Sequence, residues 1–316
     1  MPVARLQELA VCADVRRKGA LIVPAIALSI DLPNAAVAAA DGLIAAGVHR
    51  RIAAGDFRVP PMPRVAAEVL ALAQDQRSDA ARFAALIHGD QALAAGVLRL
   101  ANSAALTARS PIVSLRQAVA RLGMAEIAGI ALAASLQGGV FQLAGHEERL
   151  LRLWRHALAA GAFAREVARQ RRAGVESAYL CGLLHTIGMP VVVRLAQQEA
   201  TAAGVALSPG LIDQLSAAHY VAVGARVALE WKLPSVVAAA ISHHRDPERA
   251  GPHAADCATT WLAGRLASSL LTPAGADATP LGQDPAVALL NLYSDDVAAL
   301  VAAGPAVLAL VEAAAP

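Results

Sequence analysis

The chain has few aromatic residues, few cysteines and almost no lysine. Aromatic residues make up 3% of its 316 positions, and the three cysteines are Cys12, Cys181 and Cys257. They lie far apart, their number is odd and none belongs to a Cys-x-x-Cys pair, which argues against a disulfide framework. We therefore expect buried, inert thiols and a reducing cytosol.

An excess of charge of one sign is also absent. The chain carries 27 basic and 25 acidic residues, for a formal net charge of +2, and the two signs are interspersed. No run of five basic residues occurs, and the short clusters at 16–18 and 169–172 are typical of solvated helix ends. The sequence thus predicts no direct binding to nucleic acid or to an anionic membrane.

No uncharged stretch has the roughly 20 predominantly apolar residues of a membrane-spanning helix. The two longest cover residues 127–145, which include three polar side chains and a Gly-Gly pair, and 297–311, which Gly304 and Pro305 interrupt. The first residues lack the charged head, apolar core and cleavage site of a secretory signal. We expect a cytoplasmic protein.

No segment alternates apolar and polar residues convincingly, so no strand is expected. Hydrophobic residues form 57% of the chain, most of them alanine, leucine and valine, and alanine is the best helix former. The sequence predicts an all-α fold.

Three prolines at positions 60, 61 and 63 cannot lie inside a helix and separate two regions. We expect a helical N-terminal region of unknown role over residues 1–57, with a first helix near residues 6–10 and a further one over 35–52. A main helical domain is expected over 58–271, and a loop with a C-terminal helical extension over 272–316.

Capping and turn residues divide the rest of the chain into helices. Ser114 with Gln117 has the form of a capping box, and Gly123 and Gly174 are typical of helix C-termini. The expected helices cover residues 64–73, 79–88, 91–101, 114–122, 126–137, 147–172, 176–184, 190–203, 211–231, 234–243 and 254–271, with a terminal helical region from 284 to about 310.

Five of the nine histidines, His156, His185, His219, His243 and His244, lie on or at the ends of expected helices. Packed helices can direct such side chains toward one interior point, and neutral imidazole is a common metal ligand. Taken alone, each of these histidines is more often a core or helix-end residue than a metal ligand. Two-metal hydrolysis also needs bridging carboxylates, which an Asp directly after a His can supply.

Residues 180–188, Leu-Cys-Gly-Leu-Leu-His-Thr-Ile-Gly, resemble the central motif of the HD phosphohydrolase superfamily, a His-Asp pair on a helix followed by Ile-Gly. Residues 153–156, Leu-Trp-Arg-His, resemble its upstream histidine segment. Residues 231–234 and 241–244 resemble its downstream part.

A narrower resemblance is to the HDOD domain, the HD-related output domain of bacterial signalling proteins. It rests on Pro-Pro-Met-Pro at 60–63, Leu-Arg-Leu-Ala-Asn-Ser at 98–103 and the segment 112–123, which are similar to the N-terminal half of that domain. The resemblance covers roughly residues 59–270. It implies two packed helical lobes and a mainly regulatory, non-catalytic role.

Two positions depart from the pattern of active HD enzymes. Thr186 stands where they carry the Asp that follows the histidine, and Gly264 stands where they carry a last metal-binding Asp. Asp256 falls about two turns too early to substitute for that Asp. The resemblance therefore implies a vestigial pocket with no catalytic residue, formed by His156, His185, Thr186, His219, His243, His244 and Gly264.

The sequence thus predicts a bacterial signal-transduction module, a pseudoenzyme that acts through a signalling protein partner or through a ligand in the vestigial pocket. No cofactor is expected, and an adventitious divalent metal would be held by His156, His185, His219 and His243. The alternative is a metal-dependent phosphohydrolase acting on a nucleotide or cyclic dinucleotide. The partner and the oligomeric state, a homodimer included, stay open.

Overall fold

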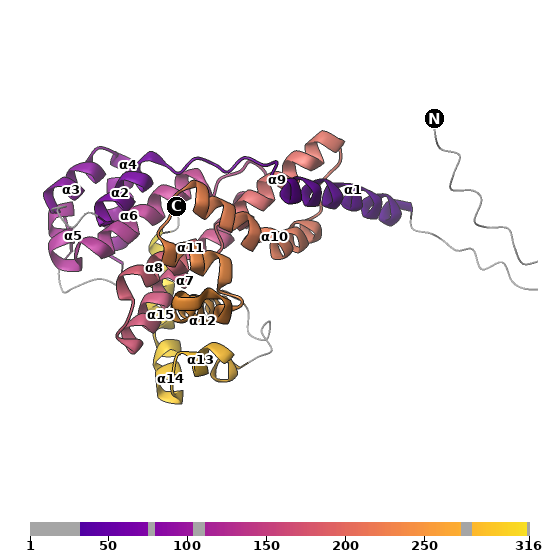
Figure 1. Cartoon of the computed structure of the whole chain (residues 1–316). Coiled ribbons are helices and arrows are strands. Elements are labelled where there is room, and N and C mark those ends of the chain that lie inside the picture. The colour runs from indigo at the N-terminus through magenta and orange to yellow at the C-terminus, as the bar shows by residue number, and fades with distance from the viewer. Residues whose placement is uncertain (1–31, 75–79, 104–110, 273–279, 315–316) are drawn as a thin grey trace, which may run out of the picture.

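The computed structural model describes residues 32–74, 80–103, 111–272 and 280–314 (Figure 1). Helices are the only regular elements in this part of the chain, and no strand occurs in it. The all-α prediction is confirmed, and it follows from the abundance of alanine and leucine together with the absence of a two-residue apolar period.

Most expected helices are present within a few residues of their expected ends. The helices are α1 (Leu32–Ala54), α2 (Arg64–Gln74), α3 (Ala80–His88), α4 (Gln91–Ala101), α5 (Leu115–Leu122), α6 (Met124–Gly139), α7 (Glu147–Arg171), α8 (Val175–Leu184), α9 (Gly188–Ala203), α10 (Pro209–Glu230), α11 (Ser235–His243), α12 (Ala254–Leu271), α13 (Pro285–Leu289), α14 (Ser294–Ala302) and α15 (Gly304–Ala314), with short 3-10 helices η1 (Pro247–His253) and η2 (Leu281–Gln283).

The helices form two packed groups. Helices α2 to α6 pack on one another and gather at one end of the molecule, and α7 to α12 form the second group (Figure 1). A buried ion pair between Arg165 of α7 and Glu126 of α6 joins the groups, and their side chains are 9% and 13% exposed. Burying a charge costs desolvation free energy, and the attraction within the ion pair offsets this cost.

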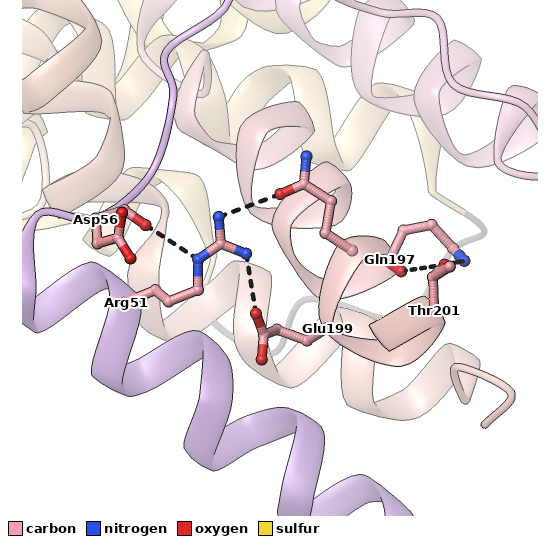
Figure 2. A network of polar contacts seen from close by, with 6 residues as sticks. Arg51, Asp56, Gln197, Glu199 and Thr201 are labelled. Atoms are coloured by element: carbon pink, nitrogen blue, oxygen red, sulfur yellow. Dashed lines mark hydrogen bonds and ion pairs between the residues drawn. The ribbon is translucent and has the colours of Figure 1, made fainter. Parts of the chain in front are cut away.

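Helix α1 belongs to the N-terminal region and packs against α9 and α10. It contains the helix expected at 35–52, whereas the helix expected near residues 6–10 lies outside the described residues. Arg51 anchors the C-terminal end of α1 (Figure 2). The Arg51 guanidinium donates to Glu199 at 2.9 Å, to Gln198 at 3.3 Å and to the Asp56 carbonyl at 3.0 Å.

The C-terminal extension is three helices rather than the single helical region expected from the sequence. Asn291 adopts a left-handed conformation, with φ 53°, in the turn between α13 and α14, and Gly304 with Pro305 starts α15 after a break. Helix α15 packs against both α7 and α4, so it contacts both groups of helices. The domain boundaries at 57 and 271 stay predictions.

The three capping signals have different outcomes. Gly123 ends α5 as expected, and its amide donates to the Val119 carbonyl. Ser114 accepts a hydrogen bond from the Gln117 amide at 3.2 Å, as expected, but the Gln117 side chain accepts from the Val113 amide instead of completing the box. The assignment of Gly174 as the end of α7 is wrong. Arg172, with φ 54°, ends that helix, and Gly174 precedes α8 because the short connection needs a second left-handed residue.

Two stretches have the length and hydropathy of a membrane-spanning helix within the described ranges. Ser177–Ala203 comprises α8, a turn and α9, and 83% of its most apolar window is buried; Ser294–Ala314 comprises α14 and α15, with 39% buried. Both are interrupted by turns, and the first belongs to the protein core. They are weak evidence for a membrane span, and the cytoplasmic location stays a prediction.

Two glycines allow helices to approach closely around residues 182–188. A Cβ at Gly182 would lie 2.4 Å from the Ala160 carbonyl oxygen on α7, and one at Gly188 would lie 2.0 Å from the Tyr220 carbonyl oxygen on α10. The Cβ of any larger residue would collide with the backbone of the neighbouring helix. The segment that carries His185 is therefore wedged between α7 and α10.

Candidate functional site

The turn between α8 and α9 carries His185 and Thr186, and the side chains of both are buried at 4% exposure. They line a cavity of about 520 Å³ that opens to solvent. We call it the histidine cavity. Its walls come from α7, the α8–α9 turn, α10, the end of α11 and α12, through Arg149, Arg152, Leu153, His156, His185, Thr186, Met189, Asp213, Tyr220, His244, Thr260, Trp261, Gly264, Arg265 and Ser268.

Three of the five singled-out histidines meet in this cavity. The ring centroids of His156 and His185 are 5.5 Å apart, and those of His185 and His244 are 5.2 Å apart with the rings nearly perpendicular at 85°. Separate elements of the fold thus bring these three histidines to one cavity.

Backbone carbonyls fix the orientation of two of the imidazoles. A carbonyl only accepts, so His185 donates from Nδ1 to the Gly182 oxygen at 2.6 Å, and His244 donates from Nδ1 to the Ala240 oxygen at 2.8 Å. The Tyr220 hydroxyl lies 2.8 Å from Nε2 of His244 and donates to it. The lone pair of His244 is thus engaged, whereas Nε2 of His185 faces Gly264.

The buried imidazoles are neutral near pH 7. Burial lowers the pKa of His156 to about 4 and that of His244 to about 4. Burial, with the neighbouring His244 and His156, lowers the pKa of His185 well below its usual value. Positive charge in the cavity therefore comes from its arginines rather than from its histidines.

The two positions that depart from the HD pattern both border His185. A Cβ at Gly264 would lie 3.2 Å from His185 Nε2, so α12 passes the imidazole with no side chain between them. Thr186 Oγ1 is buried and has no hydrogen-bond partner within the described part of the chain. Among the lining residues Asp213 supplies the one carboxylate, and it forms an ion pair with Arg149.

The structure places His219 and His243 elsewhere, which corrects the expected set. Neither histidine is among the residues that line the cavity, although Tyr220 and His244, the residues that follow them, both are. His219 turns toward α1, where its ring centroid lies 4.7 Å from that of His49.

Asp256 also lies away from the cavity. It stands in the first turn of α12, with Oδ2 3.7 Å from Nδ1 of His253 and Oδ1 close to Gly174.

Sequence reasoning missed the arginines and Tyr220. Arg149, Arg152 and His156 are spaced by three and four residues on α7, which places them on one helix face. That spacing is the pattern that could have identified the arginines. For Tyr220 the available indication was its position directly after a histidine.

A metal centre would need several ligands arranged around one point. Across residues 32–74, 80–103, 111–272 and 280–314, no three His, Cys, Asp or Glu side chains are grouped closely enough to hold an ion. The donor set of the cavity does not fit a divalent metal, because Tyr220 engages His244, Gly264 faces Nε2 of His185, and the one carboxylate among the described lining residues, Asp213, pairs with Arg149.

Comparison with known proteins identifies the relatives of this chain. An uncharacterized protein of Treponema pallidum (strain Nichols) is 26% identical over 199 residues, which are 60% of this chain but 38% of that protein. The chain thus spans well under half the length of this relative.

Two crystal structures have the same fold. One is a candidate metal-dependent phosphohydrolase of Shewanella amazonensis SB2B, with a TM-score of 0.68 and 17% identity over 88% of this chain and 100% of that one. The other is an HDOD domain protein of unknown function from Geobacter sulfurreducens, with a TM-score of 0.65 and 20% identity over 88% and 98%.

A family model for the HDOD domain matches residues 59–247, which is more than half of the sequence. The match begins at the proline segment and ends just after the last histidine of the cavity. The chain therefore belongs to the HDOD domain family.

Proposed function

We propose that this chain is a non-catalytic regulatory module of cytoplasmic signal transduction, which acts through a protein partner and through ligand occupancy of the histidine cavity. The observation that carries the proposal is the absence of a carboxylate beside His185 among the described residues, at both 186 and 264. The rest of the fold is intact around this change.

The chemistry of hydrolysis supports the proposal. Paired metal ions activate water when carboxylate oxygens bridge them and hold both at short distance. A threonine hydroxyl is a poor ligand that cannot bridge, and glycine offers no ligand. An imidazole binds one ion through one nitrogen, and Tyr220 already occupies that nitrogen in His244.

The alternative is a metal-dependent phosphohydrolase. The favouring observation is that the ring of His185 lies between two other histidine rings, with its centroid 5.5 Å from that of His156 and 5.2 Å from that of His244. The name of the Shewanella amazonensis protein points in the same direction for that protein. One ion held by His156 and His185 would be the remnant of such a site.

Metal content and turnover, measured on the same preparation, separate the two functions. The purified protein is analysed for metals and assayed for phosphodiesterase activity with added Mn²⁺ or Fe²⁺, beside His185→Ala and the control His88→Ala, an exposed histidine of α3. We expect no stoichiometric metal and equal background rates in all three. Stoichiometric metal with turnover that only His185→Ala abolishes would establish the enzyme instead.

A further inference from the structure

Basic side chains outnumber acidic ones in the lining of the histidine cavity. Three guanidinium groups line it, from Arg149, Arg152 and Arg265, against the single lining carboxylate of Asp213, which pairs with Arg149. A site built for divalent cations has the opposite balance, because its ligands include carboxylates. This lining favours an anion over a divalent cation.

Two of the arginines have acidic neighbours outside the lining. Arg152 pairs with Glu148 at 3.1 Å, but their side chains are 61% and 90% exposed, and such surface pairs exchange readily with other partners. Nε of Arg265 lies 3.9 Å from Asp284, whose carboxylate also accepts from Trp261 Nε1 and from the Ala286 amide. An incoming anion can therefore recruit Arg152 at little cost.

Thr186 gives a second, independent indication of a ligand. Its side chain is 4% exposed, it lines the cavity, and in the described structure nothing hydrogen-bonds its Oγ1. A buried hydroxyl without a partner lowers stability, so such groups in proteins usually meet a ligand or an ordered water. A ligand oxygen within the cavity would satisfy this hydroxyl.

His185 adds an acceptor to these donors. Its Nδ1–H is engaged by Gly182, so Nε2 carries a lone pair, and this nitrogen faces the space left by Gly264. A matching ligand needs oxygens that accept from arginine and threonine and also a proton to donate. A phosphate group has both near pH 7, because its second pKa is about 6 to 7, whereas an ionised carboxylate has no proton to give.

We propose that the histidine cavity binds a phosphate group, either inorganic phosphate or the end of a phosphate monoester, at the position where an HD enzyme would hold its cations. The inference rests on the proposed function, since it treats the cavity as a ligand site rather than a metal site. The volume of about 520 Å³ lies in the range of small-molecule pockets, so it accommodates an ester as well as the free ion.

Two threonine variants test the proposal by calorimetric titration with inorganic phosphate at constant ionic strength. Thr186→Val removes the unpartnered hydroxyl, so stability should be kept or increased while phosphate affinity falls about three- to tenfold. Thr259→Val is the matched control. Its hydroxyl is also buried but lies outside the cavity and accepts from Arg171 at 3.0 Å, so this variant should lose stability and keep phosphate affinity.

Two arginine variants test the charge. Arg152→Gln should lower phosphate affinity about tenfold. Arg226→Gln, which breaks a comparable pair with Glu230 outside the cavity, should leave affinity unchanged. Sulfate has the shape of phosphate but no proton at pH 7, so its binding to the unmodified protein should be about tenfold weaker.

Titration with phenyl phosphate shows whether the cavity prefers a phosphate monoester or inorganic phosphate. Tighter binding than inorganic phosphate indicates an organic ester, and equal or weaker binding indicates the free ion; both outcomes support a phosphate site. Absence of saturable phosphate binding, sulfate affinity equal to that of phosphate, or equal effects of the test and control variants would overturn the inference. If phosphate binding fails and the protein also shows no metal-dependent turnover, the regulatory function still stands.

Discussion

The turn that carries His185 determines which tautomer its neutral imidazole adopts. The Gly182 carbonyl, free at the end of α8, accepts from Nδ1, and this bond leaves a lone pair on Nε2 facing α12. His244 is held in the same way by Ala240, but Tyr220 engages its second nitrogen. Two histidines with one local geometry therefore present different chemistry to the cavity.

Tyr220→Phe tests the bond between Tyr220 and His244. The change keeps the ring but leaves His244 Nε2 buried without a donor, which should lower the free energy of unfolding by about 1 to 2 kcal/mol. Urea unfolding at pH 7.5 measures this value. Tyr293→Phe, at a 77% exposed tyrosine, is the control and should have no effect. Equal stability of the two variants would argue against the bond.

Acid should destabilise the protein through its neutral buried histidines. The pKa values of His156 and His244 are about 4 in the folded protein against 6.5 as the reference, so the unfolded chain takes up protons first as the pH falls. Stability should fall by about 1 to 2 kcal/mol per histidine between pH 7 and pH 5. Urea unfolding at several pH values measures this loss.

His156→Gln removes one titrating group and should reduce the loss of stability in acid. His88→Gln, at an exposed histidine of α3, should leave it unchanged. A free energy of unfolding that stays constant from pH 7 to pH 5 in the unmodified protein would contradict the buried, neutral state.

At the scale of the element, local signals predicted the helices well and their packing poorly. Ser114 and the proline segment act through neighbouring backbone, so the sequence alone identifies them. The need for Gly182 arises from Ala160, more than twenty residues away on another helix, and nothing in the local pattern reveals it. The break of the C-terminal region at Asn291 was likewise missed, because a left-handed asparagine leaves no clear sequence pattern.

Gly182→Ala should disrupt the crossing of α7 and α8. Its methyl group would lie 2.4 Å from the Ala160 oxygen, and backbone cannot move aside cheaply, so a loss of about 3 kcal/mol or more is expected in thermal or urea unfolding. The control is Gly42→Ala, in α1, where no atom lies within 4 Å. It should stabilise by up to about 1 kcal/mol. A Gly182→Ala protein as stable as its parent would disprove the close approach.

At the scale of the whole molecule, the sequence predicted the fold class and five of the residues that line the cavity, but not its arginines. His156, His185, Thr186, His244 and Gly264 were named in advance and lie together. The residues predicted for the pocket also included His219 and His243, which do not line it. The sequence alone does not show which face of α10 or α11 is turned toward the cavity. The arginines were missed because they reach the cavity only through the packing of α7 against α12, which the sequence does not show.

Thr186 and Gly264 deprive the cavity of a metal site. Calorimetric titration of Mn²⁺ into the unmodified protein and into the double variant Thr186→Asp/Gly264→Asp tests this directly. A side chain at 264 starts 3.2 Å from His185 Nε2, so the imidazole needs to shift by only a few tenths of an ångström. We expect saturable Mn²⁺ binding in the double variant alone. Saturable binding to the unmodified protein, abolished by His185→Ala, would contradict it.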